Sequence, residues 1–438
     1  MSILNTTLHI SDRQTRPAIS STMSDFDIET VRSQFPALSQ GQVFFDNAGG
    51  SQTLGTVIEA IHDYLSRTNV QLGASYETGK LSTERYDAGF AAGARYINAE
   101  TSEIVFGAST TQLLRNVSFA LEFAEGDEII VSSIDHEANI APWIALASRQ
   151  KLVLKWWTPS LTPSSPSPDI PNNTNTDTNP LLTPASLAPL LTSRTRLVTC
   201  THVSNILGSI HAIAEIAAAV RAGPSPEALV AVDGVSWAPH RPVDVRALGV
   251  DVYAFSWYKV YGPHLAMLYA SRRAQSRMTS LGHFFKKGDT LEEKIGLAGA
   301  SYELLHALPA LSAYLPRTAS AWAGRTRHEE ALQTALLAYL VSRADATVYG
   351  DATGSAAARV STVSFRVAGW PSRDVVEAVE AATSFGFRWG SFYSPRLVHE
   401  LLGLDDGGVV RVSLAHYNTI DEVKGFIDAM EKYVPKKG

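Results

Sequence analysis

The stretch "VDVYAFSWYKVYGPHLAMLYASR", residues 250–272, decides the fold and places a lysine at an informative position. Its first half is an apolar run typical of a buried strand. The run ends at Lys259, between two aromatic residues, and the chain then turns at Gly262-Pro263. A charged lysine is costly to bury, so Lys259 either extends its amine to solvent or is held neutral as a nucleophile. Taken alone, the position favours the solvent-exposed interpretation.

Similar apolar runs recur along the chain and alternate with segments of helical spacing. Strands are predicted at "VFFDNAGGSQTL" (a short strand before a glycine-rich turn), "EIVFGAS", "DEIIVSS", "LVLKWWT", "RLVTCTHVS", "ALVAVDGVS" and "VYAFSWY". Strands that alternate with helices indicate an α/β fold with a mostly parallel sheet covered by helices. After about Arg273 the alternation stops, and the remaining pattern predicts a smaller α+β domain.

The composition along the chain predicts the domain organisation. The polar, Ser/Thr-rich residues 1–25 are expected to form a disordered tail. A large domain is predicted over 26–290, with its first helix packing on a small C-terminal domain over 291–438. Residues 158–182, rich in Pro, Asn, Ser and Thr, are predicted to be a low-complexity surface loop inserted in the large domain.

The overall composition narrows the class of protein. The chain has 438 residues, 45% apolar and 18% charged, as in ordinary globular enzymes. The net charge of −6 gives no reason to expect nucleic acid or an acidic membrane as a partner. No apolar run reaches the ~18 residues that a membrane span needs. The single cysteine, Cys200, excludes an intramolecular disulfide and a cysteine-rich zinc site, so we expect a cytoplasmic protein without a metal.

An acidic residue gives Lys259 a chemical context. Asp233 ends the apolar run "LVAVDG", 26 residues before Lys259. In open α/β sheets, ligands bind at the carboxyl ends of the strands, where both residues are predicted to lie. Pyridoxal 5'-phosphate (PLP) requires a lysine for its aldehyde and a carboxylate opposite its ring nitrogen. The pair is therefore consistent with a PLP site, although Asp-Gly after a strand occurs in other folds.

Three further positions follow predicted strands. Ser109, Thr110 and Thr111 precede a helix, where hydroxyls and free N–H groups could bind a phosphate or simply cap the helix. His136 could stack on a cofactor ring or move a proton, and Asn205 could bond a cofactor hydroxyl. A histidine with neither role and a turn-forming asparagine are the structural alternatives, and the residues alone leave them open.

Seven motifs carry a family resemblance. They are "FFDNAGGSQ", "STTQLLRN", "DHEANIAPW", "THVSNILGSI", "VDGVSWAPHRPVDV", "FSWYKVYGPH" and "VRVSLAHYNT". In this order they resemble the class V aminotransferase family of fold type I PLP enzymes, and within it the cysteine-desulfurase-like subgroup. The resemblance spans most of the chain. It implies a large domain with a mostly parallel seven-stranded sheet, an active site at a dimer interface, and therefore a homodimer.

The resemblance also implies roles for individual residues. Lys259 is the Schiff-base lysine, Asp233 the partner of the ring nitrogen and His136 the ring-stacking histidine; these three are the expected catalytic residues. Cofactor binding is expected from Ser109, Thr110, Thr111, His136, Asn205, Asp233, Ser236, Ser256, Tyr258 and Lys259. Arg411 is expected to bind the substrate α-carboxylate, which suits its planar fork. Asn47, Arg388 and Tyr393 complete the expected substrate-binding set.

The chain departs from the desulfurase pattern at several positions. Ser236 replaces a glutamine, and Tyr258, a candidate phosphate donor, replaces a histidine. Ala300 and Ser301 in "LAGASYE" stand where a threonine contacts the partner subunit's phosphate, which puts that contact in doubt. Tyr393 in "RWGSFYS" replaces the desulfurase cysteine. Cys200 lies within a predicted strand and is expected to be a small core residue.

These features predict a PLP-dependent lyase or transferase that acts on a small α-amino acid through a carbanion or enamine. Without the cysteine nucleophile, desulfuration is disfavoured. The segments "KWWTP", "VTCTHVSN", "FSWYK" and "LYASR" resemble fungal decarboxylative aldolases of secondary metabolism. That resemblance favours β-decarboxylation or aldolase-type C–C bond formation at Cβ, with an aldehyde as co-substrate. The alternatives are another lyase, an epimerase or an aminotransferase on the same scaffold, and lastly a PLP-binding protein without catalysis.

Overall fold

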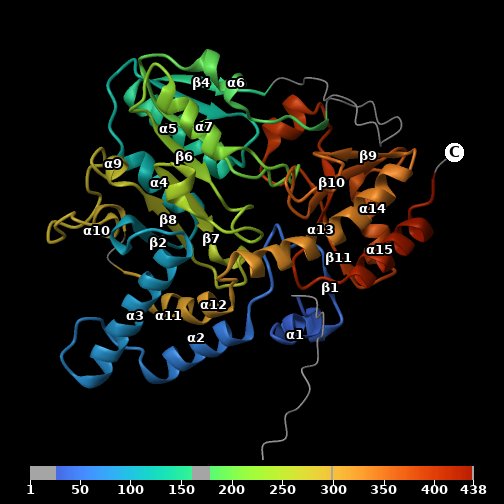
Figure 1. The fold of residues 1–438 in the computed structure, drawn as a ribbon, viewed down its shortest axis with the longest axis horizontal. Coiled ribbons are helices and arrows are strands. Elements are labelled where there is room, and N and C mark those ends of the chain that lie inside the picture. Colours follow the sequence, from blue (N-terminus) through green and yellow to red (C-terminus); the bar gives the residue numbers. More distant parts are fainter. Residues whose placement is uncertain (1–25, 160–177, 297–298, 437–438) are drawn as a thin grey trace, which may run out of the picture.

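The structure is a computed structural model that describes residues 26–159, 178–296 and 299–436. The predicted tail at 1–25 lies outside the described residues, as do residues 160–177 of the predicted inserted loop. Figure 1 shows a large sheet and a smaller sheet side by side, with the long helix α13 (Ala319–Ser342) running between them.

The large sheet has seven strands in the order β2-β8-β7-β6-β5-β3-β4. They are β2 (Ile104–Gly107), β3 (Glu128–Ser132), β4 (Val153–Trp157), β5 (Thr195–Thr201), β6 (Leu229–Asp233), β7 (Val252–Ser256) and β8 (Ala266–Ala270). Only β8 is antiparallel to its neighbours, so the predicted α/β fold with a mostly parallel seven-stranded sheet is confirmed. β8 is the strand that the strand-by-strand prediction omitted. It follows β7 after the turn at Gly262-Pro263.

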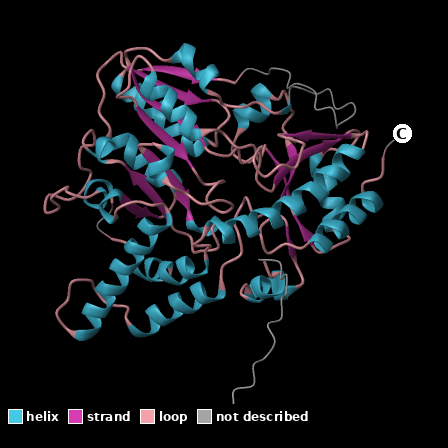
Figure 2. Cartoon of the chain, viewed as in Figure 1, coloured by secondary structure: helices cyan, strands magenta, loops and turns pink. Residues whose placement is uncertain are grey.

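Each face of the large sheet has its own apolar core, because successive side chains of a strand point to opposite faces. Ile129 and Val131 of β3 belong to the core under α4 (Thr110–Ala120) and α5 (Ala141–Gln150). Ile130 belongs to the core on the other face, which α3 (Glu77–Tyr96) and α7 (Ile213–Ala222) cover. Figure 2 shows helices on both sides of these strands. Burial on both faces explains why the strands are continuously apolar in sequence.

The small sheet is antiparallel, with the order β12-β13-β10-β9. Its strands are β9 (Ala346–Tyr349), β10 (Thr362–Val367), β12 (Arg388–Gly390) and β13 (Val409–Ser413). Helices α13, α14 (Ser372–Glu380) and α15 (Ile420–Tyr433) share a third apolar core with it. The remaining α-helices are short, except α2 (Gly55–Arg67): α6 (Pro184–Leu187), α8 (Val245–Leu248), α9 (Arg272–Gln275), α10 (Leu291–Ile295), α11 (Tyr302–His306) and α12 (Leu308–Tyr314).

The first described residues lie against the small sheet and its helices. β1 (Val43–Phe44) pairs in parallel with β11 (Phe385–Gly386). In α1 (Ile28–Ser33), Arg32 donates hydrogen bonds to the carbonyl of Tyr417 at 2.7 Å and to the carboxylate of Glu422 at 2.8 Å. These contacts bring the segment that follows β1 next to β13, where it reaches the site described below.

Helices α10, α11 and α12 pack on the large sheet or on helices beside it. α11 and α12 contact α2 and α3, and α10 contacts α4 and β2. Figure 1 shows α2, α3, α11 and α12 grouped below the large sheet. The predicted division of the chain between residues 290 and 291 stays a proposal.

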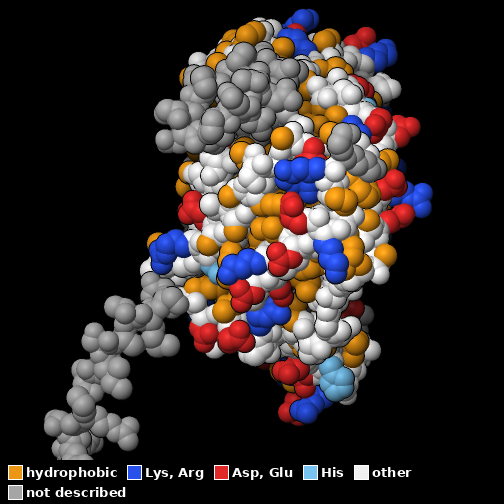
Figure 3. Space-filling view, turned by 90° about the vertical axis from the view of Figure 1, so that its right-hand side faces the viewer, with side chains coloured by type: hydrophobic (Ala, Val, Ile, Leu, Met, Phe, Trp, Pro, Cys, Tyr) orange, Lys and Arg blue, Asp and Glu red, His pale blue; other side chains and the backbone are white. Residues whose placement is uncertain are grey.

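No helix within the described ranges is long and apolar enough to cross a membrane. Figure 3 views the molecule from the side on which the small sheet lies, and acidic and basic side chains are interspersed there. On the two outer helices of this region, Arg373 pairs with Glu377 at 2.6 Å and Lys424 pairs with Asp421 at 3.3 Å.

Candidate active site

One cavity lies beside the ends of strands β2, β3, β5, β6 and β7. Thirteen residues line it: Ser109, Thr110, Thr111, His136, Ala138, Thr201, Asn205, Asp233, Val235, Ser236, Ser256, Tyr258 and Lys259. All ten residues predicted to bind the cofactor are among them. The position agrees with the rule that ligands of open α/β sheets bind outside the carboxyl ends of the strands.

Lys259 lies in a short 3-10 turn, Trp257–Lys259, directly after β7. It is only 9% exposed, so its amine does not extend into solvent as the first interpretation of the sequence favoured. Burial lowers the pKa of the Lys259 amine to about 8, and the positive charge of Arg411 acts in the same direction. The negative charges of Asp233 and Asp46 oppose this shift. An amine with this pKa is neutral, and hence nucleophilic, in about a tenth of molecules at pH 7, far more than an exposed lysine with a pKa near 10.4.

Asp233 is the last residue of β6 and is 5% exposed. Burial raises the pKa of its carboxyl, while a hydrogen bond from the Val235 N–H (2.9 Å) and the charge of Lys259 lower it. Within the described part of the chain, its second carboxylate oxygen receives no hydrogen bond. The next residue, Gly234, packs against the Tyr253 ring, and an added Cβ there would overlap that ring. The strand end therefore presents an acceptor to the cavity.

Hydroxyls and a helix N-terminus form another wall of the cavity. Ser109 caps α4, and its Oγ accepts from the Gln112 N–H at 3.1 Å. Thr110 Oγ1 lies 2.7 Å from Ser256 Oγ. The first turn of a helix has N–H groups without intrahelical partners and a partial positive charge. Capping and anion binding are thus compatible here, because only one of these N–H groups is used by the Ser109 side chain.

His136 precedes a short turn after β3, and its Nδ1 accepts from the Ala138 N–H at 3.0 Å. Burial, together with the charges of Lys259 and Arg411, lowers the pKa of the ring to about 4. The ring is therefore neutral at physiological pH, with its proton on Nε2, because Nδ1 serves as acceptor. A neutral, flat ring in the cavity suits stacking on another ring.

Arg411 on β13 is buried and contacts Asn205, one of the residues that line the cavity. Its guanidinium donates to Asp46 Oδ1 at 2.8 Å and to the carbonyl of Asn205 at 3.2 Å, and it lies 3.8 Å from the centre of the Phe392 ring. Arg388 on β12 lies 3.5 Å from Asp46 Oδ2. Asp46 was not predicted, although it lies inside the quoted motif "FFDNAGGSQ". Asp46 directly precedes Asn47, an expected substrate-binding residue, and this adjacency was the feature of the sequence that could have indicated a role for Asp46.

The "RWGSFYS" segment has an unusual backbone. Phe392 and Tyr393 have φ values of 47° and 59°, in the left-handed region that bulky residues rarely adopt. The segment is fixed by neighbouring polar groups: Asn205 Nδ2 donates to the Phe392 carbonyl at 2.9 Å, and the Glu137 N–H donates to the Tyr393 carbonyl at 2.8 Å. As a result Tyr393 is 68% exposed, with its ring centre 5.3 Å from that of His136.

The four residues predicted to bind the substrate are not among those that line the cavity, and neither is Cys200: they are Asn47, Arg388, Tyr393 and Arg411. The Asn47 amide is used within the protein: its Nδ2 donates to carbonyls of Phe44 and Ser413 at 2.9 and 2.8 Å, and its Oδ1 accepts from the Tyr417 hydroxyl. Asn47 is thus placed to hold the loop that carries Asp46 against β13. Cys200 is fully buried, and burial raises the pKa of its thiol, as befits a core residue.

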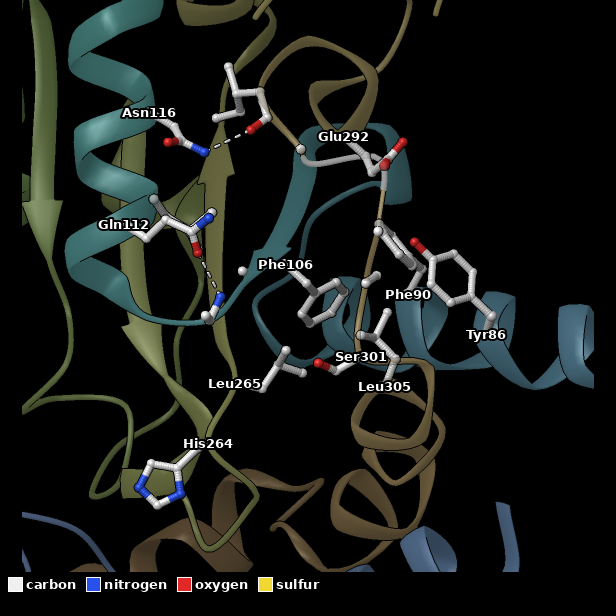
Figure 4. A pocket seen from close by; sticks show the side chains of 17 residues that line it. Tyr86, Phe90, Phe106, Gln112, Asn116, His264, Leu265, Glu292, Ser301 and Leu305 are labelled. Carbon is white, nitrogen blue, oxygen red and sulfur yellow. Dashed lines mark hydrogen bonds between the residues drawn. The ribbon is translucent and has the colours of Figure 1, made fainter. Parts of the chain in front are cut away.

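Ala300 and Ser301 lie on the wall of a second cavity, shown in Figure 4. Its floor is largely apolar and includes Phe90, Phe106 and Leu305. Residues 297 and 298 of the segment predicted to contact a partner subunit lie outside the described residues.

The chemistry of the first cavity fits PLP. A buried amine, a carboxylate with a free acceptor, a neutral imidazole and an anion-binding helix N-terminus match the aldehyde, ring nitrogen, ring face and phosphate of this cofactor. Fold and site together define a PLP-dependent enzyme of fold type I.

Comparison with known proteins identifies the family. The aminotransferase class-V model matches residues 43–426, so the chain belongs to this family and uses PLP. The "Aminotransferase-like protein FGM3" of Gibberella zeae is 53% identical over 93% of this chain and 98% of its own length. The "Cysteine desulfurase-like protein ustD" of Aspergillus flavus is 39% identical over 94% and 91%. Among solved structures, the cysteine desulfurase CsdA of Escherichia coli is 25% identical over 93% and 98%, with a TM-score of 0.78. The predicted cysteine-desulfurase-like membership of class V is confirmed.

Proposed function

We propose that this enzyme removes the β-carboxylate of a small dicarboxylic α-amino acid and forms a new bond at Cβ, with an aldehyde as the co-substrate. The proposal is supported by the buried Lys259 amine, whose pKa is lowered to about 8, and by the resemblance that puts Tyr393 at the position of the desulfurase cysteine. Cys200 is fully buried in the core and is unsuited to that role. A carbanion reaction without sulfur transfer fits this set of groups.

Each side chain has a defined task in the proposed reaction. Bound PLP supplies an electron sink for charge that develops on the substrate. Arg411 holds the α-carboxylate with its planar fork and so fixes the orientation of the bonds at Cα. Lys259, with its lowered pKa, takes a proton from the substrate and returns it as general base and acid. Asp233 would accept a hydrogen bond from the protonated ring nitrogen of the cofactor, and neutral His136 would stack on the face of its ring.

The assembly is part of the proposal. We propose a homodimer, because the second cavity beside Ala300 and Ser301 offers an apolar wall close to the segment expected to meet a partner subunit. The oligomeric state of the purified protein, measured by light scattering, tests this directly.

The reaction is tested with purified holoenzyme and L-aspartate, with and without an aldehyde such as benzaldehyde. The expected result is release of CO2 in both cases, with a new hydroxy amino acid as the product when the aldehyde is present and alanine as the product when it is absent. Lys259→Ala is expected to abolish both products. If aspartate is recovered intact and its Cβ hydrogens do not exchange with deuterated water, the proposed reaction is wrong.

A second candidate is transamination, which the name of the 53% identical relative, "Aminotransferase-like protein FGM3", favours. It would convert the amino acid to a keto acid and leave the cofactor in its amine form. Keto acid formation without CO2 release from the β-position would select this candidate. Racemised substrate would instead select an epimerase, and sulfide from cysteine would select a desulfurase.

A further inference from the structure

Two arginines lie directly opposite each other at the edge of the site. In the antiparallel pair β12–β13, Arg388 is the register partner of Arg411. Like charges at opposed positions destabilise a sheet unless an anion lies between them. Here that anion is a single carboxylate: Asp46 places Oδ1 2.8 Å from Arg411 and Oδ2 3.5 Å from Arg388. The two arginines therefore form an anion site in which the Asp46 carboxylate balances only one of the two positive charges.

Both guanidinium groups keep unused donors. The buried Nε of Arg411 has no hydrogen-bond partner among the described residues. The Arg388 guanidinium makes no hydrogen bond to any described residue. Its 3.5 Å approach to Asp46 Oδ2 is an ion pair. Its side chain is 50% exposed, so an incoming ligand can reach it. Phe392 packs against both groups, 3.8 Å from Arg411 and 5.5 Å from Arg388, and limits their movement.

The charges indicate which ligand fits. Arg388, Arg411 and Asp46 together carry one net positive charge. An α-amino acid with one carboxylate is a zwitterion of zero charge, whereas one with a second, side-chain carboxylate carries one net negative charge. The dicarboxylic amino acid is therefore the complementary ligand. Gly49 packs beside this carboxylate, since an added Cβ would lie 2.8 Å from Asp46 Oδ2 and would displace it.

We propose that Arg388 binds the side-chain carboxylate of a dicarboxylic amino acid while Arg411 binds its α-carboxylate. Asp46 pairs with both guanidinium groups and fixes their positions. The proposal rests on the proposed function for the reaction and names the residue that selects its substrate. The Arg388 contact is made in the bound substrate and is kept until the C–C bond breaks. It therefore stabilises the bound substrate and the transition state alike, and contributes to KM rather than to kcat.

The experiment uses unreactive ligands and the holoenzyme, so that it does not depend on turnover. Calorimetry measures the Kd of succinate, with two carboxylates, and of butyrate, with one carboxylate and the same chain length. Wild type, Arg388→Gln and Arg388→Met are compared, and Arg373→Gln removes an exposed arginine of the same region as the matched control. In parallel, KM and kcat are measured with L-aspartate.

We expect wild type and Arg373→Gln to bind succinate about tenfold more tightly than butyrate. Both Arg388 variants should lose this preference while the Kd of butyrate stays within twofold. With L-aspartate, KM should rise about tenfold and kcat stay within threefold. The proposal is wrong if wild type binds succinate and butyrate equally. It is also wrong if the Arg388 variants weaken the binding of both ligands to the same extent, or weaken neither. If the preference for succinate depends on Arg388 but L-aspartate releases no CO2, the proposed function is contradicted and the role of Arg388 stands.

Discussion

At the scale of single residues, the chemistry of this protein depends on how far each group is removed from water. Lys259 illustrates the effect, because the same side chain on the surface would be almost fully protonated at neutral pH. Burial and the nearby charge of Arg411 lower the pKa of its amine to about 8. The fold thus prepares a nucleophile before any cofactor arrives.

The rate of cofactor uptake should follow the protonation of Lys259. We predict that apoenzyme mixed with PLP regains its visible absorbance faster as the pH rises from about 7 to 9, and then at a constant rate, because the neutral amine reacts. Stopped-flow absorbance measures this profile. An exposed lysine, with a pKa near 10.4, would give a rate that still increases at about pH 10. That outcome would contradict the buried amine.

Sequence could identify the residues of the site but not how they are paired. Lys259 and Asp233 each end an apolar run, so their common location at strand ends followed from the pattern. Asp46 and Arg411 are 365 residues apart, and nothing local in either segment indicates that they meet. The left-handed backbone of Phe392 and Tyr393 was equally hidden, since neither residue is one that usually adopts it.

At the scale of elements, the close packing of neighbouring strands controls what the site can tolerate. Gly234, directly after β6, faces the Tyr253 ring of β7. This ring is fully buried, and its hydroxyl lies 2.9 Å from His202 Nδ1, so it has little room to move.

Replacing Gly234 should therefore destabilise the protein and displace Asp233. We predict that Gly234→Ala lowers the free energy of unfolding by about 2–3 kcal/mol, as overpacking does. Gly425 in α15 is the matched control, because its added Cβ would make only an ordinary contact, 3.5 Å from Phe385. Gly425→Ala should raise the free energy by about 0.5–1 kcal/mol through helix propensity. Urea denaturation measures both, and equal effects would contradict the packing argument.

The elements themselves were predictable where their pattern was strong. Six strands of the large sheet follow from apolar runs of β length between amphipathic helices. β8 was missed because it follows β7 after a short turn, without the intervening helix that marked the others. The composition change after residue 273 could not show on which sheet α10, α11 and α12 would pack, since that depends on contacts with α2, α3 and α4.

At the scale of the whole molecule, several histidines are buried outside the cofactor cavity. Burial lowers the pKa of His202 to about 3 and of His211 to about 4, and lowers that of His416 well below its usual range. These rings stay neutral in the folded protein and take up protons on unfolding below about pH 6.5. Asp135 acts in the opposite sense, because burial raises the pKa of its carboxyl to about 7.

Among the described residues, six histidines have lowered pKa values and three carboxyls, those of Asp135, Asp233 and Asp251, have raised ones, so the free energy of unfolding should fall as the pH falls from about 6.5 to 4.5. Each net proton taken up contributes about 1.4 kcal/mol per pH unit. Urea denaturation of the holoenzyme across this range measures the slope. His211→Asn should reduce it by up to one proton. A stability that is constant with pH, or rises towards acid, would contradict this prediction.

The pairing of β1 with β11 also has a consequence for biosynthesis. Val43 finds its partner, Phe385, only 342 residues later in the chain. At a translation rate of about 5–20 residues per second, that partner emerges roughly 20 to 70 seconds after β1 does. Throughout this interval the nascent chain carries an unpaired strand and a carboxylate, Asp46, without its arginines. The active site is therefore among the last parts of the molecule to be completed on the ribosome.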